Sequence, residues 1–361
     1  MDINLITPIN QLGYGIVGTN ILKALSNKHN VALWILGTGE AHPSDHDTIK
    51  SAVSNAHFFN KHAPCLRIWH QHDMSMHVGK GVHAGMPIFE LDTFTQLERH
   101  HLQSLDKVLV NSNWAKMILE KHDIKTGSIV PLGVDTSIFF PTNLNTQKTT
   151  RFLNVGKWEI RKGHDVLLEA FNKAFEPNDD VELIMNCHNP FLVSKDRDDN
   201  QKWEKMYKTS KMGDRITIIS ERLNTQQELA HLMNQCDCGI FPSRAEGWNL
   251  DMLEMMACGK TVITTEYSAH TEYCNFMNAI LIPIDKKEPA FDGIWFKGQG
   301  EWAHLGNNEI DMLVSYMRNF HFIKQRGAKI DNAVGLKVAK ELSWDNTANK
   351  IVEALNEKGG S

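Results

Sequence analysis

Short apolar runs alternate with longer segments of helical period along the whole chain. The short runs, of about four to eight residues, have the length of buried strands, and the longer segments repeat apolar residues every three or four positions. This alternation is typical of β-α-β units around a parallel sheet and predicts the α/β class. In the first half it predicts strands at residues 3–7, 31–36, 65–70, 107–111 and 127–131, and helices at 18–27, 48–59, 93–104 and 115–121.

A polar segment separates the first half from a second alternation of the same kind. Residues 141–151 read PTNLNTQKTTR, which has no apolar periodicity and is typical of a linker. A chain of 361 residues also favours two domains, because single cores stop growing near about 250–300 residues. We expect an N-terminal domain at 1–145, a C-terminal domain at 151–335 and a terminal helix at 341–358. The second half predicts strands at 152–156, 181–186, 216–219, 238–242, 261–264 and 279–283, and helices at 164–174, 225–234 and 252–257.

Composition narrows the classes of function. Lys and Arg total 38 against 43 Asp and Glu, a formal net charge of −5, so no global positive field attracts nucleic acid or an anionic membrane. A local basic patch and a peripheral membrane contact stay open. The N-terminus has no basic and apolar leader, and no apolar stretch of about 18 residues occurs, so we expect a cytoplasmic protein without a membrane span. The 6 Cys residues are too sparse for a disulfide framework.

Three glycines near the N-terminus form the pattern G-x-G-x-x-G. Gly13, Gly15 and Gly18 lie between a predicted strand and a predicted helix, and Glu40 follows about twenty residues later, as in dinucleotide-binding proteins. In that fingerprint the first glycine lies directly at the end of the strand, whereas here residues 8–12 intervene. The spacing favours a longer glycine-rich loop, which could point backbone N–H groups at an anionic or polyhydroxyl ligand. A purely structural turn is the alternative.

A more specific motif lies in the second half, FPSRAEGWNLDMLEMMACGKTVITT at 241–265. It resembles the signature of retaining nucleotide-sugar glycosyltransferases of family 4, whose GT-B fold has two Rossmann-like domains facing across a deep cleft. That signature has a strand, Pro-Ser, Glu-Gly-aromatic, a helix with a second Glu eight positions after the first, a Gly and another strand. Here the two acids are Glu246 and Glu254. Asn249 stands where the family usually has Gly, and Asn tolerates positive φ, so we expect the loop to keep its shape.

Other segments resemble the same family in order and spacing. NVGKWEIRKGHDVLLEAF at 154–171 is similar to the family's strand, Gly, basic residue, second basic residue five positions on, and helix. VPLGVDTSIFFP at 130–141 resembles the segment that closes the first domain, and ELSWDNTANKIVEAL at 341–355 resembles the terminal helix that crosses back to it. The resemblance therefore covers essentially the whole chain and implies a donor-binding second domain.

The chemistry of the matching residues suits a sugar nucleotide. Lys157 and Lys162 can neutralise a diphosphate, and a helix N-terminus offers backbone N–H groups to its oxygens. Carboxylates accept well from hydroxyl groups and poorly suit phosphate, so Glu246 and Glu254 are expected to bind sugars. Eight helical residues rise about 12 Å, roughly the span from hexose to ribose, and the resemblance assigns Glu246 to the hexose and Glu254 to the ribose. The expected donor-side residues are Gly15, Lys157, Lys162, Glu246, Gly247, Trp248, Asn249, Leu250 and Glu254.

Each of these roles has a structural alternative. The lysines could be solvated surface cations, and Glu254 could lie on a solvated helix face. The apolar neighbours of Glu254, among them Met252, Met255 and Met256, instead favour its burial and therefore a partner.

In the first domain, IWHQHDM at 68–74 places His70 and His72 on one face of a strand end. The resemblance implies that one of them lines the site near the donor sugar. His72 is the better choice, and a core role is the alternative for His70. We expect Gly13, His70, Glu90 and Asp92 on the acceptor side. The residues expected to take part in catalysis are His72, Lys157, Lys162 and Glu246.

No metal and no cofactor are expected. Cys236 and Cys238 lie in a segment with the pattern of a buried strand, where Cys behaves as a small apolar residue. The acidic run DRDD at 196–199 has the pattern of a solvated loop rather than of a divalent-metal site. GT-B enzymes generally need no bound metal, so the resemblance points the same way.

Together these features predict a retaining, metal-independent hexosyltransferase that moves a hexose from a UDP- or GDP-sugar to an acceptor hydroxyl. The sequence identifies no carboxylate for a double displacement, which favours a front-face route in which the leaving phosphate oxygen takes the acceptor's proton. The alternatives are an NAD(P)-linked oxidoreductase that uses the glycine segment and a non-catalytic protein that binds sugar nucleotides. Polysaccharide, glycolipid, protein and modified DNA all stay open as acceptors, although the net charge of −5 disfavours DNA.

Overall fold

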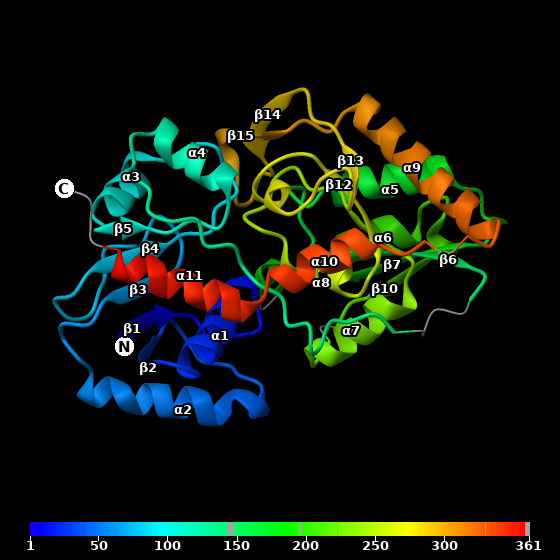
Figure 1. Cartoon of the computed structure of the whole chain (residues 1–361). Coiled ribbons are helices and arrows are strands. Elements are labelled where there is room, and N and C mark those ends of the chain that lie inside the picture. The colour runs from blue at the N-terminus through cyan, green and yellow to red at the C-terminus, as the bar shows by residue number, and fades with distance from the viewer. Residues whose placement is uncertain (143–146, 195–196, 222, 329, 358–361) are drawn as a thin grey trace. The chain divides into compact units, whose positions relative to one another are not determined.

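A computed structural model describes residues 1–142, 147–194, 197–221, 223–328 and 330–357 (Figure 1). The chain divides into two compact units, and each is described by itself. Unit 1 comprises Met1–Val134 and the chain from Glu341 onward, and unit 2 comprises Asp135–Lys340. Among the described residues, no helix has the length and apolar content needed to cross a membrane.

Unit 1 is built on a five-stranded parallel sheet with the order β2-β1-β3-β4-β5. Helix α11 packs beside α1 and so adds the end of the chain to this unit (Figure 1). The strands are β1 (Asp2–Thr7), β2 (Asn30–Ile35), β3 (Cys65–Ile68), β4 (His83–Met86) and β5 (Lys107–Val108). The helices are α1 (Gly13–Ser26), α2 (His46–Asn55), α3 (Gln96–Gln103), α4 (Asn113–Lys121) and α11 (Trp344–Asn356).

Unit 2 is built on a six-stranded parallel sheet with the order β10-β7-β6-β11-β12-β13. Its strands are β6 (Thr150–Gly156), β7 (Val181–Cys187), β10 (Ile216–Ile219), β11 (Cys238–Phe241), β12 (Thr261–Thr265) and β13 (Ile280–Ile282), with two short antiparallel pairs, β8 (Val193–Ser194) with β9 (Arg197–Asp198) and β14 (Lys287–Phe291) with β15 (Lys297–Ala303). Its helices are α5 (His164–Ala174), α6 (Asn200–Lys208), α7 (Gln226–Gln235), α8 (Leu250–Ala257), α9 (Asn307–Gln325) and α10 (Ala333–Glu341).

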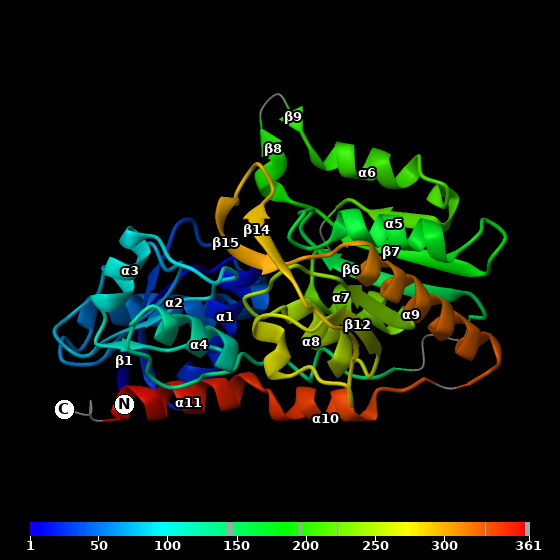
Figure 2. The ribbon, with the colours of Figure 1, turned by 90° about the horizontal axis from the view of Figure 1, so that it is seen from above.

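The core of unit 2 follows from the apolar strands that the sequence predicts. Apolar side chains of β6, β7, β11 and β12, among them Phe152, Leu183 and Ile263, are fully buried and pack with the apolar faces of α5 and α9, two helices that lie side by side (Figure 2). Burying both faces of a parallel sheet is what makes its strands continuously apolar. The largest buried side chains of this core include Trp158, Phe152 and Phe171.

Several predicted elements need correction. Residues 127–131 form no strand, because Ile129 makes only an isolated bridge with Val110. The predicted glycine-rich loop is wrong as well, since α1 already begins at Gly13 and contains all three glycines. Sequence periodicity missed β4, which is only 4 residues long, and also α6, α9 and the two short hairpins.

The first unit ends at Val134, whereas the sequence pattern places the boundary at 145. The segment that follows Val134 is tied to unit 2 through α7. The Asn234 side chain donates to the Phe140 carbonyl (3.0 Å) and accepts from the Thr142 backbone N–H (2.8 Å). These hydrogen bonds join residues far apart in sequence, so no local pattern reveals them. Part of the predicted linker, 143–146, lies outside the described residues.

Candidate active site

The predicted donor-side residues of unit 2 meet at one edge of its sheet. From β6 the chain first adds β7 and β10 on one side of the sheet and then β11 and β12 on the other. The strand order therefore reverses between β6 and β11, and we call this position the switch point of the sheet. In open α/β sheets, ligands bind at the carboxyl ends of the strands at such a point. Lys157 and Lys162 follow β6, and Glu246 follows β11, so the fold brings these three residues to that position.

Glu246 is buried in a shell of hydrogen-bond donors. Its Oε1 accepts from Lys162 Nζ (2.8 Å) and Ser243 Oγ (2.7 Å), and its Oε2 accepts from Arg161 Nη1 (3.0 Å). Only 4% of the residue is exposed. Burial alone would raise the pKa of Glu246, but the positive charges of Lys162 and Arg161 outweigh it and lower that pKa well below its usual range. Glu246 is therefore a carboxylate at any physiological pH.

Lys157 lies in the same network through a second carboxylate. Its Nζ pairs with Glu159 Oε1 (2.9 Å), and Glu159 Oε2 accepts from Arg161 Nη2 (2.8 Å). Burial would raise the pKa of Glu159, but the charges of Arg161 and Lys157 lower it. Lys157 is the most accessible member, with 37% of its side chain exposed. The two predicted lysines are thus each paired with a carboxylate, and neither is the solvated surface cation of the alternative interpretation.

Sequence reasoning missed Arg161 and Glu159. The signal was present in KWEIRK at 157–162, which contains three basic residues and one acid within six positions. Sequence spacing alone could not show that the side chains of Glu159 and Arg161 are buried, because the loop after β6 is irregular and has no regular period. Arg161 is 5% exposed and Glu159 7% exposed, so both belong to the buried network.

The N-terminus of α8 lies next to Glu246 in the chain and has the shape that the motif predicts. Asn249 takes φ 72°, which confirms that it replaces the usual glycine in the left-handed region. Its Oδ1 accepts from the Met252 backbone N–H (3.2 Å) and caps the helix, while the Tyr273 hydroxyl lies 2.7 Å from its carbonyl oxygen. Within the described part of the chain, Asn249 Nδ2 and Trp248 Nε1 are buried donors without a hydrogen-bond partner. Buried donors beside a helix N-terminus suit an anion.

Glu254 lies within α8, eight positions after Glu246, and its surroundings differ from those of Glu246. It is 6% exposed, and its carboxylate makes no hydrogen bond or ion pair with any described residue. Burial, followed by the charge of Asp251, raises the pKa of Glu254 well above its usual range. A buried acid without a partner excludes the solvated-face alternative and leaves an acceptor for a ligand hydroxyl.

In unit 1, the predicted histidines lie beyond the end of β3 rather than on the strand. The rings of His70 and His72 stack at 5.4 Å, and His70 also contacts the Tyr14 ring at 4.6 Å. The Tyr14 hydroxyl donates to the Ile88 carbonyl (2.7 Å), and burial, together with the charge of Glu90, raises its pKa strongly. The strand order of this sheet reverses between β1 and β3, so Tyr14 and the histidines lie at its switch point.

The acids predicted on the acceptor side are placed less uniformly. Glu90 is half-buried and its charge acts on Tyr14, which places it with the histidines. Asp92 is 4% exposed, and its carbonyl oxygen lies 3.2 Å from His122 Nε2. Asp73, which follows His72, binds the buried Arg67 (2.6 Å).

The three glycines of α1 do not form a phosphate-binding turn. A Cβ on Gly15 would lie 2.2 Å from Asn10 Oδ1, and one on Gly18 would lie 2.5 Å from the Pro8 carbonyl, so both glycines permit close packing of α1 on its own loop. A Cβ on Gly13 would meet nothing within 4 Å, so open space remains there. Glu40 is exposed and lies beyond the end of β2 at Ile35. This geometry gives no support to a dinucleotide site.

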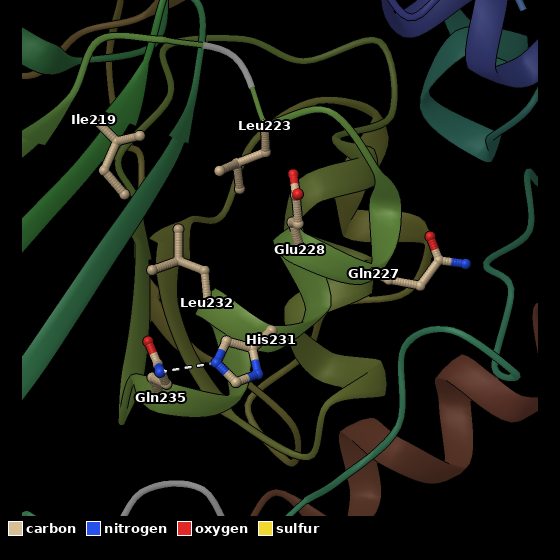
Figure 3. A pocket seen from close by; sticks show the side chains of 7 residues that line it. All are labelled: Ile219, Leu223, Gln227, Glu228, His231, Leu232 and Gln235. Carbon is tan, nitrogen blue, oxygen red and sulfur yellow. Dashed lines mark hydrogen bonds between the residues drawn. The ribbon is translucent and has the colours of Figure 1, made fainter. Parts of the chain in front are cut away.

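Two pockets of unit 2 contain none of the predicted site residues. One, of about 430 Å³, is lined by Ile219 of β10, Leu223 of the following segment, and residues of α7 that include His231 and Leu232 (Figure 3). The other, of about 560 Å³, lies between the ends of α5 and α9. We place the site at the switch point because charge, burial and unpaired donors coincide there, whereas neither pocket contains such a cluster.

The described residues of the Cys pair at 236 and 238 and of the acidic run at 196–199 belong to no cluster that could hold a metal ion. No three His, Cys, Asp or Glu side chains in the described ranges gather as a metal site requires. Cys236 and Cys238 are buried free thiols, which confirms their predicted burial. Asp198 Oδ1 accepts from the Asn200 backbone N–H (2.9 Å) at the start of α6, and Asp199 pairs with Lys202 (3.0 Å). Asp196 lies outside the described residues.

Comparison with known proteins identifies the same half of the chain. The profile of the family described as "Glycosyl transferases group 1" matches residues 149–294, which contain the buried ion pairs and α8. N,N'-diacetylbacillosaminyl-diphospho-undecaprenol alpha-1,3-N-acetylgalactosaminyltransferase of Campylobacter jejuni is 22% identical over 231 residues, 62% of this chain and 54% of the relative. An uncharacterized glycosyltransferase, YqgM of Bacillus subtilis, is 22% identical over 184 residues, 49% of this chain and 46% of the relative. The chain thus spans about half the length of the curated relatives it matches.

Solved structures share the fold of the whole chain. Sucrose-phosphate synthase from Thermosynechococcus elongatus superposes with a TM-score of 0.70 at 15% identity, over 98% of this chain and 97% of that one. HepE of Anabaena, solved in complex with UDP, gives a TM-score of 0.69 at 15% identity, over 98% of this chain and 99% of that one. The predicted α/β architecture of the GT-B type is therefore confirmed, and residues 149–294 match the model of the group 1 glycosyltransferase family.

Proposed function

We propose that this protein is a retaining glycosyltransferase that moves a hexose from a nucleotide sugar to an acceptor hydroxyl. The observation that carries the proposal is the switch point of unit 2. There the fold places paired lysines, buried donors at the α8 N-terminus and two buried acids of opposite character. Unit 1 holds the predicted acceptor residues.

The donor diphosphate suits the cations of the network. Lys157, Arg161 and Lys162 pair with Glu159 and Glu246, and the charge of Asp251 also acts on Lys162. A diphosphate would take the lysines as its counter-ions and the unpaired donors of Trp248 and Asn249 as further partners. Lysine suits this exchange because its ammonium group is a point charge on a flexible stem.

The two acids are proposed to bind the two sugars of the donor. Glu246 stays ionised and accepts from hexose hydroxyls near the reacting carbon, whereas Glu254 accepts from the ribose. In the front-face route, the bond from the anomeric carbon to the phosphate oxygen breaks, and the acceptor oxygen bonds to the same face. The acceptor's proton passes to the departing phosphate oxygen. Lys157, Lys162 and the helix N-terminus stabilise the charge that builds on the diphosphate.

We propose that UDP is the first nucleotide to test, because two structural neighbours are described as complexes with UDP and with UDP-glucose. A thermal-shift series with UDP, GDP and ADP should raise the unfolding temperature for the nucleotide that binds, by RT ln(1 + [L]/Kd). Slow hydrolysis of UDP-glucose then separates an enzyme from a binding protein. NMR of the transfer product should show an α linkage, and a β linkage would rule out retention.

A further inference from the structure

Arg161 links the two loops that form the donor site. Besides Glu246 and Glu159, its guanidinium donates to the Ala245 carbonyl (2.7 Å), and its own carbonyl accepts from the Arg244 backbone N–H (2.7 Å). One residue therefore fixes the loop after β6 to the loop after β11 by two side-chain hydrogen bonds, to Ala245 and Glu246, and by one backbone hydrogen bond from Arg244. A planar guanidinium can hold several acceptors at once in a fixed geometry, whereas an ammonium group cannot.

The hydrogen bonds of Glu246 leave room for a ligand on one oxygen. A carboxylate has about four acceptor positions, two on each oxygen. Among the described residues, Lys162 and Ser243 occupy both positions of Oε1, and Arg161 occupies one of Oε2. A hexose hydroxyl can therefore donate to Oε2 beside Arg161.

Donor binding changes this arrangement if Lys162 turns toward the diphosphate. Glu246 then loses one of its two cationic partners in a site with almost no solvent. A buried carboxylate without a positive partner is strongly unfavourable. Arg161 is held in place, because its guanidinium group is shared between Glu246, Glu159 and Ala245.

We propose that Arg161 is a positioning residue that holds Glu246 charged and oriented toward the hexose while Lys162 pairs with the donor diphosphate. This inference rests on the proposed function. Glu159 contributes to this arrangement, because it accepts a hydrogen bond from Arg161 Nη2 and so fixes the orientation of the guanidinium group. The other titratable or charged groups that act on this centre are Lys162 from the loop after β6, Asp251 from α8, and His270 and Tyr273 from the segment after β12.

The first arm of the test needs no donor. Arg161→Met, Glu246→Gln and the double variant are compared by thermal unfolding at pH 7. Each single change should lower the unfolding temperature, and the double variant should unfold close to the less stable single variant, because both changes break the same pair. Arg151→Met is the matched control. It removes an Arg–Glu pair (2.9 Å) at the opposite end of β6, and its effect should add to that of Glu246→Gln.

The second arm measures UDP binding and UDP-glucose turnover. Arg161→Met should lower kcat by roughly 10²-fold, the loss that a small misplacement in an active site causes. It should also raise the Kd for UDP by roughly tenfold or more, because without Arg161 a Lys162 that turns to the diphosphate leaves Glu246 buried with no cation. The acidic limb of the kcat profile should move to higher pH in Arg161→Met. Arg161→Lys, which restores the charge without the fork, should recover that limb but only part of kcat.

The outcomes are distinct. Additive effects of Arg161→Met and Glu246→Gln overturn the pairing without any donor. Coupled effects with an unchanged kcat and an unchanged pH profile overturn the positioning role. A wild-type protein that neither binds UDP nor hydrolyses UDP-glucose refutes the proposed function with this donor, and the thermal comparison still decides whether the pair exists.

Discussion

At the scale of single residues, environment separates two glutamates that look alike in the sequence. Glu246 and Glu254 are eight positions apart and equally buried, at 4% and 6% exposed. Cations surround the first and lower its pKa, whereas burial and a neighbouring acid raise the pKa of the second. Two acids with pKa values pushed in opposite directions are suited to different tasks.

The first prediction assigns those tasks. Glu246→Gln should lower kcat by about 10²-fold, equivalent to about 3 kcal/mol, because the hexose loses its charged acceptor. It should not weaken the binding of UDP, because UDP has no hexose. At a pH above the raised pKa of Glu254, where this acid is ionised, Glu254→Gln should weaken the binding of UDP by about 1–3 kcal/mol through the lost charge-assisted bonds to ribose. Calorimetric titration with UDP and steady-state kinetics of both variants measure this. If Glu246→Gln loses UDP affinity and Glu254→Gln loses only kcat, the donor orientation is the reverse.

The second prediction concerns pH and Glu254. Because its folded-state pKa is raised, folding favours the protonated acid. The stability from that preference is present below the unfolded pKa of about 4.3 and is lost as pH rises through the folded pKa. As pH rises from 5 to 8, the unfolding temperature of the wild type should therefore fall relative to that of Glu254→Gln, in which the side chain is a neutral isostere. Glu353→Gln, at an exposed position of α11, is the control and should track the wild type. A difference in unfolding temperature between wild type and Glu254→Gln that stays constant from pH 5 to pH 8 would contradict the raised pKa.

At the scale of elements, the site depends on how two helices begin. Helix α8 starts from a left-handed Asn249 whose side chain caps it, and α5 starts from Gly163 at φ 71°, where a Cβ would lie 2.0 Å from the Pro242 carbonyl. Both starts follow strands that flank the switch point, so they aim the loops of the site.

The third prediction tests the start of α8. Asn249→Ala loses the cap and keeps an unfavourable left-handed backbone, so it should destabilise unit 2 by about 1–3 kcal/mol. Asn249→Gly loses the cap but gains a residue suited to positive φ, so its cost should be within about 0.5 kcal/mol. Denaturant midpoints of the two variants give the comparison. Equal destabilisation by both would show that backbone strain plays no part.

The fourth prediction tests the role of the glycines in α1. Gly18→Ala should destabilise unit 1 by about 2 kcal/mol or more, because its Cβ would lie 2.5 Å from the Pro8 carbonyl. Gly13→Ala meets nothing within 4 Å and should be neutral or slightly stabilising. Thermal unfolding measures both effects, and added NADH should change the unfolding temperature of neither variant. A shift with NADH that Gly13→Ala abolishes would instead support a dinucleotide site.

At the scale of the whole molecule, each unit carries its candidate residues at the switch point of its own sheet. The fold thereby assigns the place of a site in each unit before any side chain is considered. In unit 2 that place is filled by cations and helix-terminal donors, which is the chemistry that a diphosphate requires.

The fifth prediction follows from that chemistry. Because side-chain cations and the α8 N-terminus are proposed to neutralise the leaving diphosphate, hydrolysis of UDP-glucose should continue in excess EDTA at about its initial rate. Measuring UDP release with and without EDTA, and after adding Mn²⁺ or Mg²⁺, is sufficient. A rate lost in EDTA and restored only by a divalent ion would contradict a metal-independent site.

Sequence patterns predicted most of the fold where the signal was local. Helix 164–174 and strand 216–219 coincide with α5 and β10, because their apolar periods are complete within the element. The short strand β4 and the start of α1 were missed, since four residues give too little period and three glycines mask a helix. The motif placed Lys157, Lys162, Glu246 and Glu254 in one unit, and their roles in binding and catalysis stay predictions.

The sequence by itself determined the α/β architecture, through its alternation of apolar runs and helical periods, and it contains the segment at 149–294 that matches the group 1 glycosyltransferase model. Tertiary structure alone decided the partners of the site residues. Arg161 reaches Glu246 across 85 positions of sequence, whereas Glu254, within α8, has no hydrogen bond or ion pair from its carboxyl group to any described residue. Such contacts depend on which loops the sheet order brings together, and electrostatic surroundings follow from that placement rather than from local sequence.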